Sequence, residues 1–307
     1  MLIEKVYFAA TDDIQLFGLL HKSEKENKEK KVILSVHGMT SNCTKKREEI
    51  FAEEFTNNGI DYFSFNNRGS DIITYFEKVK NGKLITRIES GSANEVFENC
   101  YCDIKGAILM LLEKGYKNIY LQGHSYGSAK IVYTYNRLKA NMELDILSSI
   151  KNIILLSIVD VPRMTKGMLG EKFNNVLSEI KQMVNENRGE ELIKREYFLH
   201  PITANNFLFL CKSGGTIDVA PVGDENADYI ALNNIEIPLL MMWGKERDLI
   251  MQKPEELERI IKKNVKNEKL LVKFIDGTGH NYRYKEKETA EEILKFLKGK
   301  GKGTELN

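Results

Sequence analysis

Cysteine, proline and tryptophan are scarce in this chain of 307 residues, which contains four, five and one of them, respectively. The cysteines are Cys43, Cys100, Cys102 and Cys211, and their spacing gives neither a CxxC redox pair nor a repeated metal-ligand pattern. We therefore expect reduced thiols without a disulfide framework, which is typical of a cytoplasmic protein. Because His, Cys, Asp and Glu do not cluster as metal ligands do, no metal centre is expected.

Long apolar runs and an excess of charge of either sign are also missing. No segment approaches the ~18–20 apolar residues of a membrane span, and the opening MLIEKVYFAATDD lacks the pattern of a signal peptide. Lys and Arg number 45 against 44 Asp and Glu, so the formal charge is +1. This balance leaves no excess of positive charge that would attract nucleic acid or an anionic membrane, and neither is expected as a partner.

Short apolar runs alternate with segments of helical periodicity along most of the chain. VILSVHG (32–38) and IDYFSFN (60–66) are typical of strands buried on both faces, and the segment between them is typical of a helix. This alternation predicts an α/β fold with a mostly parallel central sheet and helices on both faces. Further strands are expected at 3–9, 14–21, 117–122, 152–159, 237–243 and 270–275, and helices at 45–58, 95–115, 125–139, 254–264 and 285–297.

Two segments interrupt the alternation. Residues 70–93 contain an Asn81-Gly82 turn and are interpreted as a surface hairpin. Residues 160–234 contain one amphipathic helix and loop-like sequence, and about 75 residues are far more than two core strands need for a connection. We expect residues 160–234 to form a cap or lid, residues 1–159 and 235–300 to form the core, and residues 301–307 to be a flexible tail.

The strongest chemical motif is Gly123-His124-Ser125-Tyr126-Gly127, which matches G-x-S-x-G. It follows the predicted strand NIYLQ and opens a predicted helix. In that context the serine stands at a strained strand-to-helix turn, and its hydroxyl projects from the carboxyl edge of the sheet. The start of the helix favours negative charge at the same point. Ser125 is therefore the candidate nucleophile.

A serine nucleophile needs a base, and the base needs a carboxylate to orient it. His280 follows the last predicted strand in a glycine-flexed loop, which places it at the same sheet edge as Ser125. Asp248 follows the strand 237–243 and is the favoured acid, with Glu246 as the alternative. Asp276 is interpreted as a turn former. The order Ser125, Asp248, His280 then gives a Ser-His-Asp triad.

An oxyanion formed in such a reaction needs two hydrogen-bond donors. The backbone N–H of Tyr126, directly after the nucleophile, supplies one. The second is expected from the loop after the strand 32–38, where Gly38 allows a close approach and the N–H of Met39 donates.

Together these motifs resemble the α/β-hydrolase superfamily. VHGMTSN, NNRGSD, GHSYG, WGKERD and GTGH occur in the order and spacing of that superfamily, from about residue 30 to 297. PITANNFLF and GSANEVFENCYCDI resemble small bacterial capped serine esterases, including relatives of the fungal siderophore-esterase group. The resemblance implies the α/β-hydrolase fold, a cap between the sixth and seventh strands, and chemistry without a cofactor.

The predicted function is hydrolysis of a carboxylic ester or thioester of a small molecule through an acyl-enzyme. A peptidase or amidase on the same scaffold stays open, and so does a non-catalytic ligand-binding protein, because a fold alone does not fix function. The candidate substrate-binding residues in the expected cap are Met164, Met168, Phe207 and Phe209.

Overall fold

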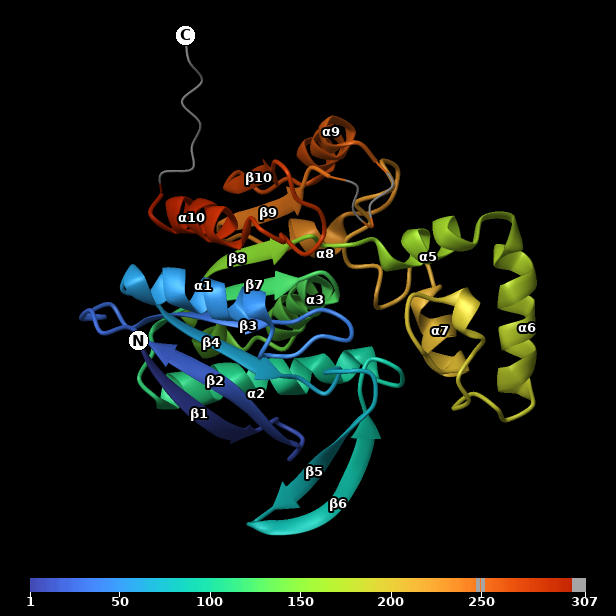
Figure 1. Cartoon of the computed structure of the whole chain (residues 1–307), viewed down its shortest axis with the longest axis horizontal. Helices are drawn as coiled ribbons and strands as arrows, with labels where there is room; N and C mark the ends of the chain where they lie inside the picture. The colour runs from blue at the N-terminus through green and yellow to red at the C-terminus, as the bar shows by residue number, and fades with distance from the viewer. Residues whose placement is uncertain (247–248, 250–251, 300–307) are drawn as a thin grey trace.

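An eight-stranded sheet forms the centre of the computed structural model, which describes residues 1–246, 249 and 252–299 (Figure 1). The strand order is β1-β2-β4-β3-β7-β8-β9-β10. β2 runs antiparallel to β1 and β4, and every pairing from β4 to β10 is parallel. The predicted parallel sheet is therefore confirmed. The strands of this sheet are β1 (Leu2–Ala9), β2 (Gln15–Lys22), β3 (Lys31–Val36), β4 (Asp61–Asn66), β7 (Asn118–His124), β8 (Ile150–Leu156), β9 (Leu239–Gly244) and β10 (Leu270–Ile275).

The strand β3 shows why this sheet needs helices on both faces. Val32, Leu34 and Val36 point into one hydrophobic cluster, and Ile33 points into a second one on the opposite face. All four side chains are fully buried. Successive residues of a strand point to opposite faces, so an uninterrupted apolar run requires cover on both.

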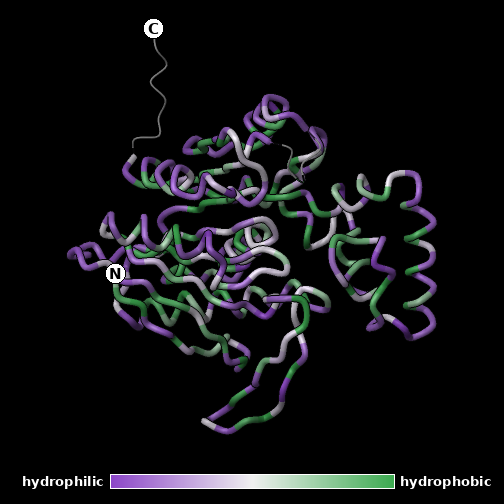
Figure 2. Tube along the Cα trace, viewed as in Figure 1, coloured by the Kyte–Doolittle hydropathy of each residue, from purple (hydrophilic) through white to green (hydrophobic). Residues whose placement is uncertain are grey.

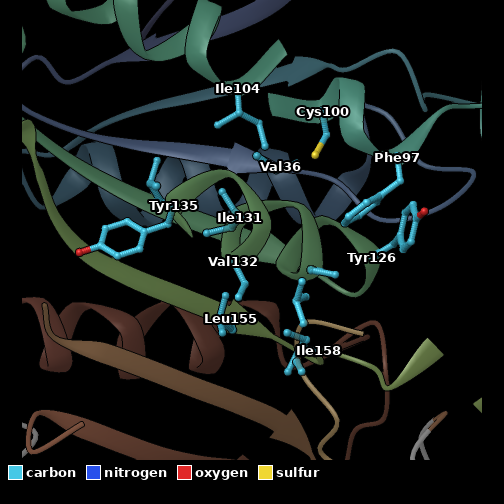
Figure 3. Packing of buried hydrophobic residues seen from close by; sticks show 14 of the residues in the cluster. Val36, Phe97, Cys100, Ile104, Tyr126, Ile131, Val132, Tyr135, Leu155 and Ile158 are labelled. Atoms are coloured by element: carbon cyan, nitrogen blue, oxygen red, sulfur yellow. The ribbon is translucent and has the colours of Figure 1, made fainter. Parts of the chain in front are cut away.

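Helices cover the two faces accordingly. α1 and α10 pack against each other on one face, while α2, α3 and α9 contribute to the larger cluster on the other face (Figure 1). Figure 3 shows α3 within this cluster, where Ile131 and Val132 lie near Val36 and Leu155 of the sheet. The core helices are α1 (Lys46–Asn57), α2 (Cys100–Glu113), α3 (Tyr126–Ala140), α4 (Leu144–Ser149), α9 (Pro254–Asn264) and α10 (Glu286–Leu297).

The predicted surface hairpin consists of β5 (Thr74–Lys80) and β6 (Lys83–Ser90). Its turn is Asn81-Gly82, and both residues have positive φ, 50° and 72°, as a tight two-residue hairpin turn requires. Figure 1 shows the hairpin projecting from the body of the molecule.

Between β8 and β9 the chain leaves the sheet and forms four α-helices and two short 3₁₀ helices. α5, α6 and α7 lie together beyond the carboxyl ends of the central strands, whereas α8 packs on α3 (Figure 1). The predicted tail, residues 301–307, lies outside the described residues. No described helix has the length and apolar character needed to cross a membrane. The four helices are α5 (Val161–Leu169), α6 (Phe173–Asn185), α7 (Ala204–Leu210) and α8 (Ile230–Asn233).

Candidate active site

The turn that carries Ser125 joins β7 to α3 in a strained geometry. Ser125 has φ 55° and ψ −122°, a region in which residues with a side chain are held only by their surroundings. A Cβ on Gly123 would lie 2.5 Å from Ser128 Cα, and one on Gly127 would lie 2.2 Å from the Val36 carbonyl oxygen. Both motif glycines are therefore required by the close packing of α3 on the strands.

A cavity of about 240 Å³ opens at this turn and joins residues from distant parts of the sequence. Ser125 and His280 both line it, and so do Met39 and Tyr126. The structure thus brings together four of the five residues predicted for the triad and the oxyanion hole. The remaining lining residues are Gly38, Thr40, Ser41, His124, Val159, Val161, Met164, Leu199, His200, Leu249 and Asn281.

The loop after β3 approaches the serine closely. A Cβ on Gly38 would lie 3.0 Å from Ser125 Cβ and 3.1 Å from the His124 carbonyl oxygen, so a glycine lets the backbone pass at this point. Met39 follows directly. On the other side, Tyr126 is the first residue of α3, where backbone N–H groups have no acceptor within the helix. Both predicted oxyanion donors therefore border the serine turn.

The loop after β10 is fixed from two sides. The Tyr282 hydroxyl donates to the Met242 carbonyl oxygen (2.7 Å) and accepts from Ser157 Oγ (3.0 Å). His124 Nε2 donates to the carbonyl oxygen of His280 (2.7 Å), and the two imidazole rings have centroids 4.9 Å apart. His124 thus links the serine turn to the backbone of the predicted base.

Three further histidines stand in or near the cavity in a poorly hydrated environment. Burial lowers the pKa of His37 to about 3 and lowers the pKa of His124 well below its usual value. Burial also lowers the pKa of His200. His200 Nδ1 donates to the Pro201 carbonyl oxygen (2.8 Å), while its Nε2 lies 3.5 Å from Met39 Sδ. The sequence pattern singled out neither His124 nor His200, because neither follows a strand in a flexible loop.

Buried ion pairs anchor the helix that follows the Ser125 turn. Lys130 of α3 donates to Glu95 Oε2 (2.5 Å) and Asn67 Oδ1 (3.0 Å), and both charged side chains are almost fully buried. Arg68 pairs with the buried Asp103 (2.6 Å). Burial raises the pKa of Glu95 and of Asp103. The neighbouring cations, Lys130 and Arg68, act in the opposite direction and partly offset these shifts. These contacts tie α3 and α2 to the loop after β4.

A second charged cluster joins α5 to the loops that follow it. The Arg163 guanidinium contacts Asp160 (3.1 Å), Asp218 (3.1 Å) and Asp224 (3.0 Å). Asp160 is nine-tenths buried and also accepts from the backbone N–H of Gly223 (3.3 Å). Burial raises the pKa of Asp160, and Arg163 opposes that shift.

Of the acidic residues considered from the sequence, Glu246 and Asp276 lie among the described residues. Asp248 lies outside the described residues. The side chain of Glu246 is exposed and does not line the cavity, although its backbone N–H donates to the Thr278 carbonyl oxygen (2.9 Å). Asp276 forms an exposed ion pair with Lys245 (2.8 Å).

The four predicted substrate-binding residues occupy different environments. Met164 lines the cavity, whereas the other three are not among its lining residues. Met168 is 45% exposed and Phe207 is fully buried in the large hydrophobic cluster. Phe209 packs on Phe97 with ring centroids 5.8 Å apart. The apolar wall of the cavity is instead completed by Val159, Val161, Leu199 and Leu249.

Comparison with solved structures identifies the architecture. Est1E from Butyrivibrio proteoclasticus with bound ferulic acid is 18% identical, with a TM-score of 0.64 over 96% of this chain and 99% of that one. A thermostable carboxyl esterase from Bacillus coagulans is 12% identical, with a TM-score of 0.66 over 97% and 99%. The monoglyceride lipase of Saccharomyces cerevisiae is 12% identical, with a TM-score of 0.64 over 99% and 97%. This chain has the α/β-hydrolase fold.

The α/β-hydrolase fold that the motifs predicted is therefore confirmed. No family model and no curated protein sequence matches the chain. Among the described residues of the chain, no group of three or more His, Cys, Asp or Glu side chains could hold a metal ion.

Proposed function

We propose that this α/β-hydrolase is a serine hydrolase of carboxylic esters. The observation that carries the proposal is the shared cavity, in which a serine at a strained strand-to-helix turn faces the same space as a loop histidine. Ser125 is the proposed nucleophile and His280 the proposed base. The comparison structures support the substrate class, because they include two esterases and a monoglyceride lipase.

In the proposed reaction, Ser125 Oγ attacks the ester carbonyl carbon while His280 removes the hydroxyl proton. The backbone N–H groups of Met39 and Tyr126 donate to the oxygen that becomes negative. The intermediate then collapses, the carbon–oxygen bond to the alcohol breaks, and His280 protonates the departing oxygen. Water attacks the resulting acyl-enzyme with His280 again as base, which releases the acid and returns the proton to Ser125.

Asp248 is the proposed acid that orients His280. Two facts about its competitors support this choice. Glu246 is exposed to solvent, and the carboxylate of Asp276 is already paired with Lys245 at the surface. A carboxylate that fixes the tautomer of a catalytic imidazole works best when it is withdrawn from water.

Residues 160–234 are proposed to cap the cavity. Val161 and Met164 of α5, together with Leu199 and His200, contribute to its lining. These residues come from the long connection between β8 and β9, and they face Met39 and Ser125 of the sheet edge. The substrate would therefore be bound between the sheet edge and this connection, with its apolar part against α5.

The direct test is labelling with a fluorophosphonate probe, combined with turnover of p-nitrophenyl esters from acetate to decanoate, a feruloyl ester, a thioester and an aminoacyl amide. We expect labelling of Ser125 and turnover of at least one ester. Ser125→Ala should abolish labelling and reduce turnover at least about 10³-fold, with an unchanged circular dichroism spectrum.

The proposal fails if Ser125→Ala retains turnover within tenfold of the parent protein. Absence of both labelling and turnover would favour a non-catalytic binding protein. Faster turnover of the amide than of every ester would reassign the activity to a peptidase or amidase.

A further inference from the structure

Among the described residues, the long connection between β8 and β9 contributes one polar side chain to the cavity. Val161, Met164 and Leu199, which it also contributes, are apolar, whereas His200 can form hydrogen bonds. Figure 2 shows hydrophilic and hydrophobic residues mixed along this connection, which includes α5, α6 and α7. An apolar wall with one well-placed hydrogen-bonding group is typical of a site that selects its ligand by a polar contact.

The His200 ring is held in one orientation. The Phe198 ring packs edge-on against it, with centroids 5.1 Å apart and an interplanar angle of 78°. His200 Nδ1 donates to the Pro201 carbonyl oxygen (2.8 Å). The chain that follows is anchored as well, because the Thr203 N–H donates to the Ala93 carbonyl oxygen (2.9 Å). His200, which is nine-tenths buried, is therefore oriented before any ligand enters the cavity.

The hydrogen bond to Pro201 fixes the tautomer of this ring. A carbonyl oxygen can only accept, so Nδ1 carries the proton. Burial lowers the pKa of His200, and the ring is therefore neutral at about pH 7, with a lone pair on Nε2. Nε2 lies 3.5 Å from Met39 Sδ, and a thioether sulfur has no proton to donate. Among the described residues, this acceptor on a buried ring thus meets no hydrogen-bond donor.

We propose that His200 is a specificity-determining residue whose Nε2 accepts a hydrogen bond from a hydroxyl group of the ester substrate. This inference rests on the proposed function and narrows its substrate class to hydroxylated esters. An ester without the hydroxyl would leave the acceptor unsatisfied, and a buried acceptor without a partner costs free energy. A hydroxyl suits the cavity better than a charged ammonium donor, because the neighbouring wall of the connection is apolar.

Met39 indicates where this hydroxyl lies relative to the reacting carbonyl. The Met39 side chain contacts His200, and its backbone N–H is a proposed donor to the oxyanion. The hydroxyl should therefore stand a few bonds from the ester carbonyl, on either the acyl or the alcohol part. Esters of β-hydroxybutyrate meet this condition on the acyl part, and glyceryl esters meet it on the alcohol part.

Two pairs of esters test the preference, and the members of each pair differ in hydroxyl groups near the carbonyl. The acyl pair is methyl β-hydroxybutyrate and methyl butyrate. The alcohol pair is glyceryl monobutyrate and propyl butyrate. At about pH 7.5, we expect kcat/KM to be at least about tenfold higher for the hydroxylated ester in at least one pair. That pair identifies the part of the ester that His200 contacts.

Substitutions of His200 separate recognition from the intrinsic reactivity of the esters. His200→Asn keeps a side-chain N–H near Nδ1 for Pro201 but has no atom at Nε2, so the ratio of the two kcat/KM values should fall about tenfold. His200→Gln places an amide oxygen near Nε2 and should retain a larger ratio than His200→Asn. His21→Asn is the matched control, because His21 is a buried histidine of β2 that does not line the cavity. It should leave the ratio unchanged.

Binding of the same esters to Ser125→Ala separates this inference from the proposed function. Calorimetry should show the same preference in Kd, and the double variant Ser125→Ala, His200→Asn should lose it. Equal Kd and equal kcat/KM within both pairs overturn the role of His200, although turnover would still support a serine hydrolase. A preference that His200→Asn retains overturns it as well. Absence of all turnover contradicts the proposed function, and the Kd values then decide the role of His200 by themselves.

Discussion

At position 125 the backbone adopts a geometry that costs about 1–3 kcal/mol in most settings. The surrounding packing compensates for this cost, because Gly123 lets β7 approach Ser128 of α3 and Gly127 lets α3 approach the end of β3. In this geometry Ser125 is half-buried and lines the cavity. The strained backbone at this residue thus distinguishes the proposed nucleophile from an ordinary surface serine.

The proposed acid gives the first prediction at this scale. Asp248→Asn should reduce kcat about 10³–10⁴-fold, because an amide favours the wrong tautomer of His280. Glu246→Gln should change kcat less than about threefold, because the Glu246 side chain is exposed and does not line the cavity. Steady-state kinetics on one p-nitrophenyl ester compares the two matched amide substitutions, and the reverse ranking would make Glu246 the acid.

His37 gives a prediction about pH. Its pKa is lowered by burial to about 3 in the folded protein, against about 6.5 in the unfolded chain. Between these values only the unfolded state binds the proton, so stability falls as the pH is lowered. From pH 6.5 to 5.0, His37 alone should remove about 2 kcal/mol from the free energy of unfolding.

The check is urea unfolding at both pH values for the parent protein and for His37→Asn, which carries no titrating ring. Between pH 6.5 and 5.0, the free energy of unfolding of the variant should fall by about 2 kcal/mol less than that of the parent protein. This difference does not depend on the stability of the variant at pH 6.5. Equal losses in both proteins would mean that His37 takes up a proton in the folded state.

The limits of sequence reasoning are clearest at the level of single side chains. Ser125 and His280 were predicted because strand ends and glycine motifs fix where the backbone emerges. His124 and His200 were not, because their roles depend on the direction of a side chain across the cavity. Phe207 and Phe209 were predicted as pocket residues from apolarity alone, and apolarity does not distinguish a cavity wall from a core position.

At the level of elements, α5 and α7 have different relations to the cavity. Val161 and Met164 of α5 line it, whereas Phe207 of α7 does not and is fully buried in the hydrophobic cluster. The two helices also contact each other. α5 therefore shapes the space available to a substrate, and α7 holds α5 in place.

This difference predicts opposite outcomes for two truncations. Met164→Ala enlarges the cavity and should shift the preference toward longer acyl chains, because a shorter side chain at this position leaves room for a longer acyl group. Phe207→Ala should cost about 3–5 kcal/mol of stability with little change in preference. Melting temperature and chain-length profile, measured on both variants, distinguish the two roles. An unchanged profile for Met164→Ala together with a large loss of stability would place Met164 in the core.

Most elements were predictable because the strands are short apolar runs and the long helices show clear periodicity. Exceptions are α4, α7 and α8, six, seven and four residues long, which contain too few turns for a hydrophobic period to be visible. α5, nine residues long, was also not predicted, although its buried Val161, Met164 and Thr165 recur at helical spacing.

For the whole molecule, the Arg163 cluster connects the start of α5 to the chain that returns toward the sheet. Asp160, Asp218 and Asp224 are held around one guanidinium. Gln252 adds a hydrogen bond to the Gly223 carbonyl oxygen (2.9 Å) from beyond β9. Charge pairing thus ties the start of the long connection to its returning segment, and the Gln252 hydrogen bond joins that segment to the chain after β9.

Arg163→Gln should therefore destabilise the protein at pH 7 by about 2–4 kcal/mol, because it leaves the buried Asp160 without its cation. Burial already raises the pKa of Asp160, and loss of Arg163 raises it further. A carboxyl with a raised pKa takes up a proton in the folded state first, so the destabilisation should shrink as the pH falls from 7 toward 5. Urea unfolding of parent and variant at both pH values measures this, and a deficit independent of pH would contradict it.

The strand order also has a consequence for synthesis of the protein. β3 pairs with β4 and β7, and the sheet is completed only by β9 and β10. Met39, Ser125 and His280 therefore enter one cavity from three widely separated stretches of sequence. While the chain emerges from the ribosome, the serine turn exists well before the loop that carries the histidine. A nascent chain that has not yet released residue 280 holds the proposed nucleophile without its proposed base, so the proposed ester cleavage requires the last strand to have joined the sheet.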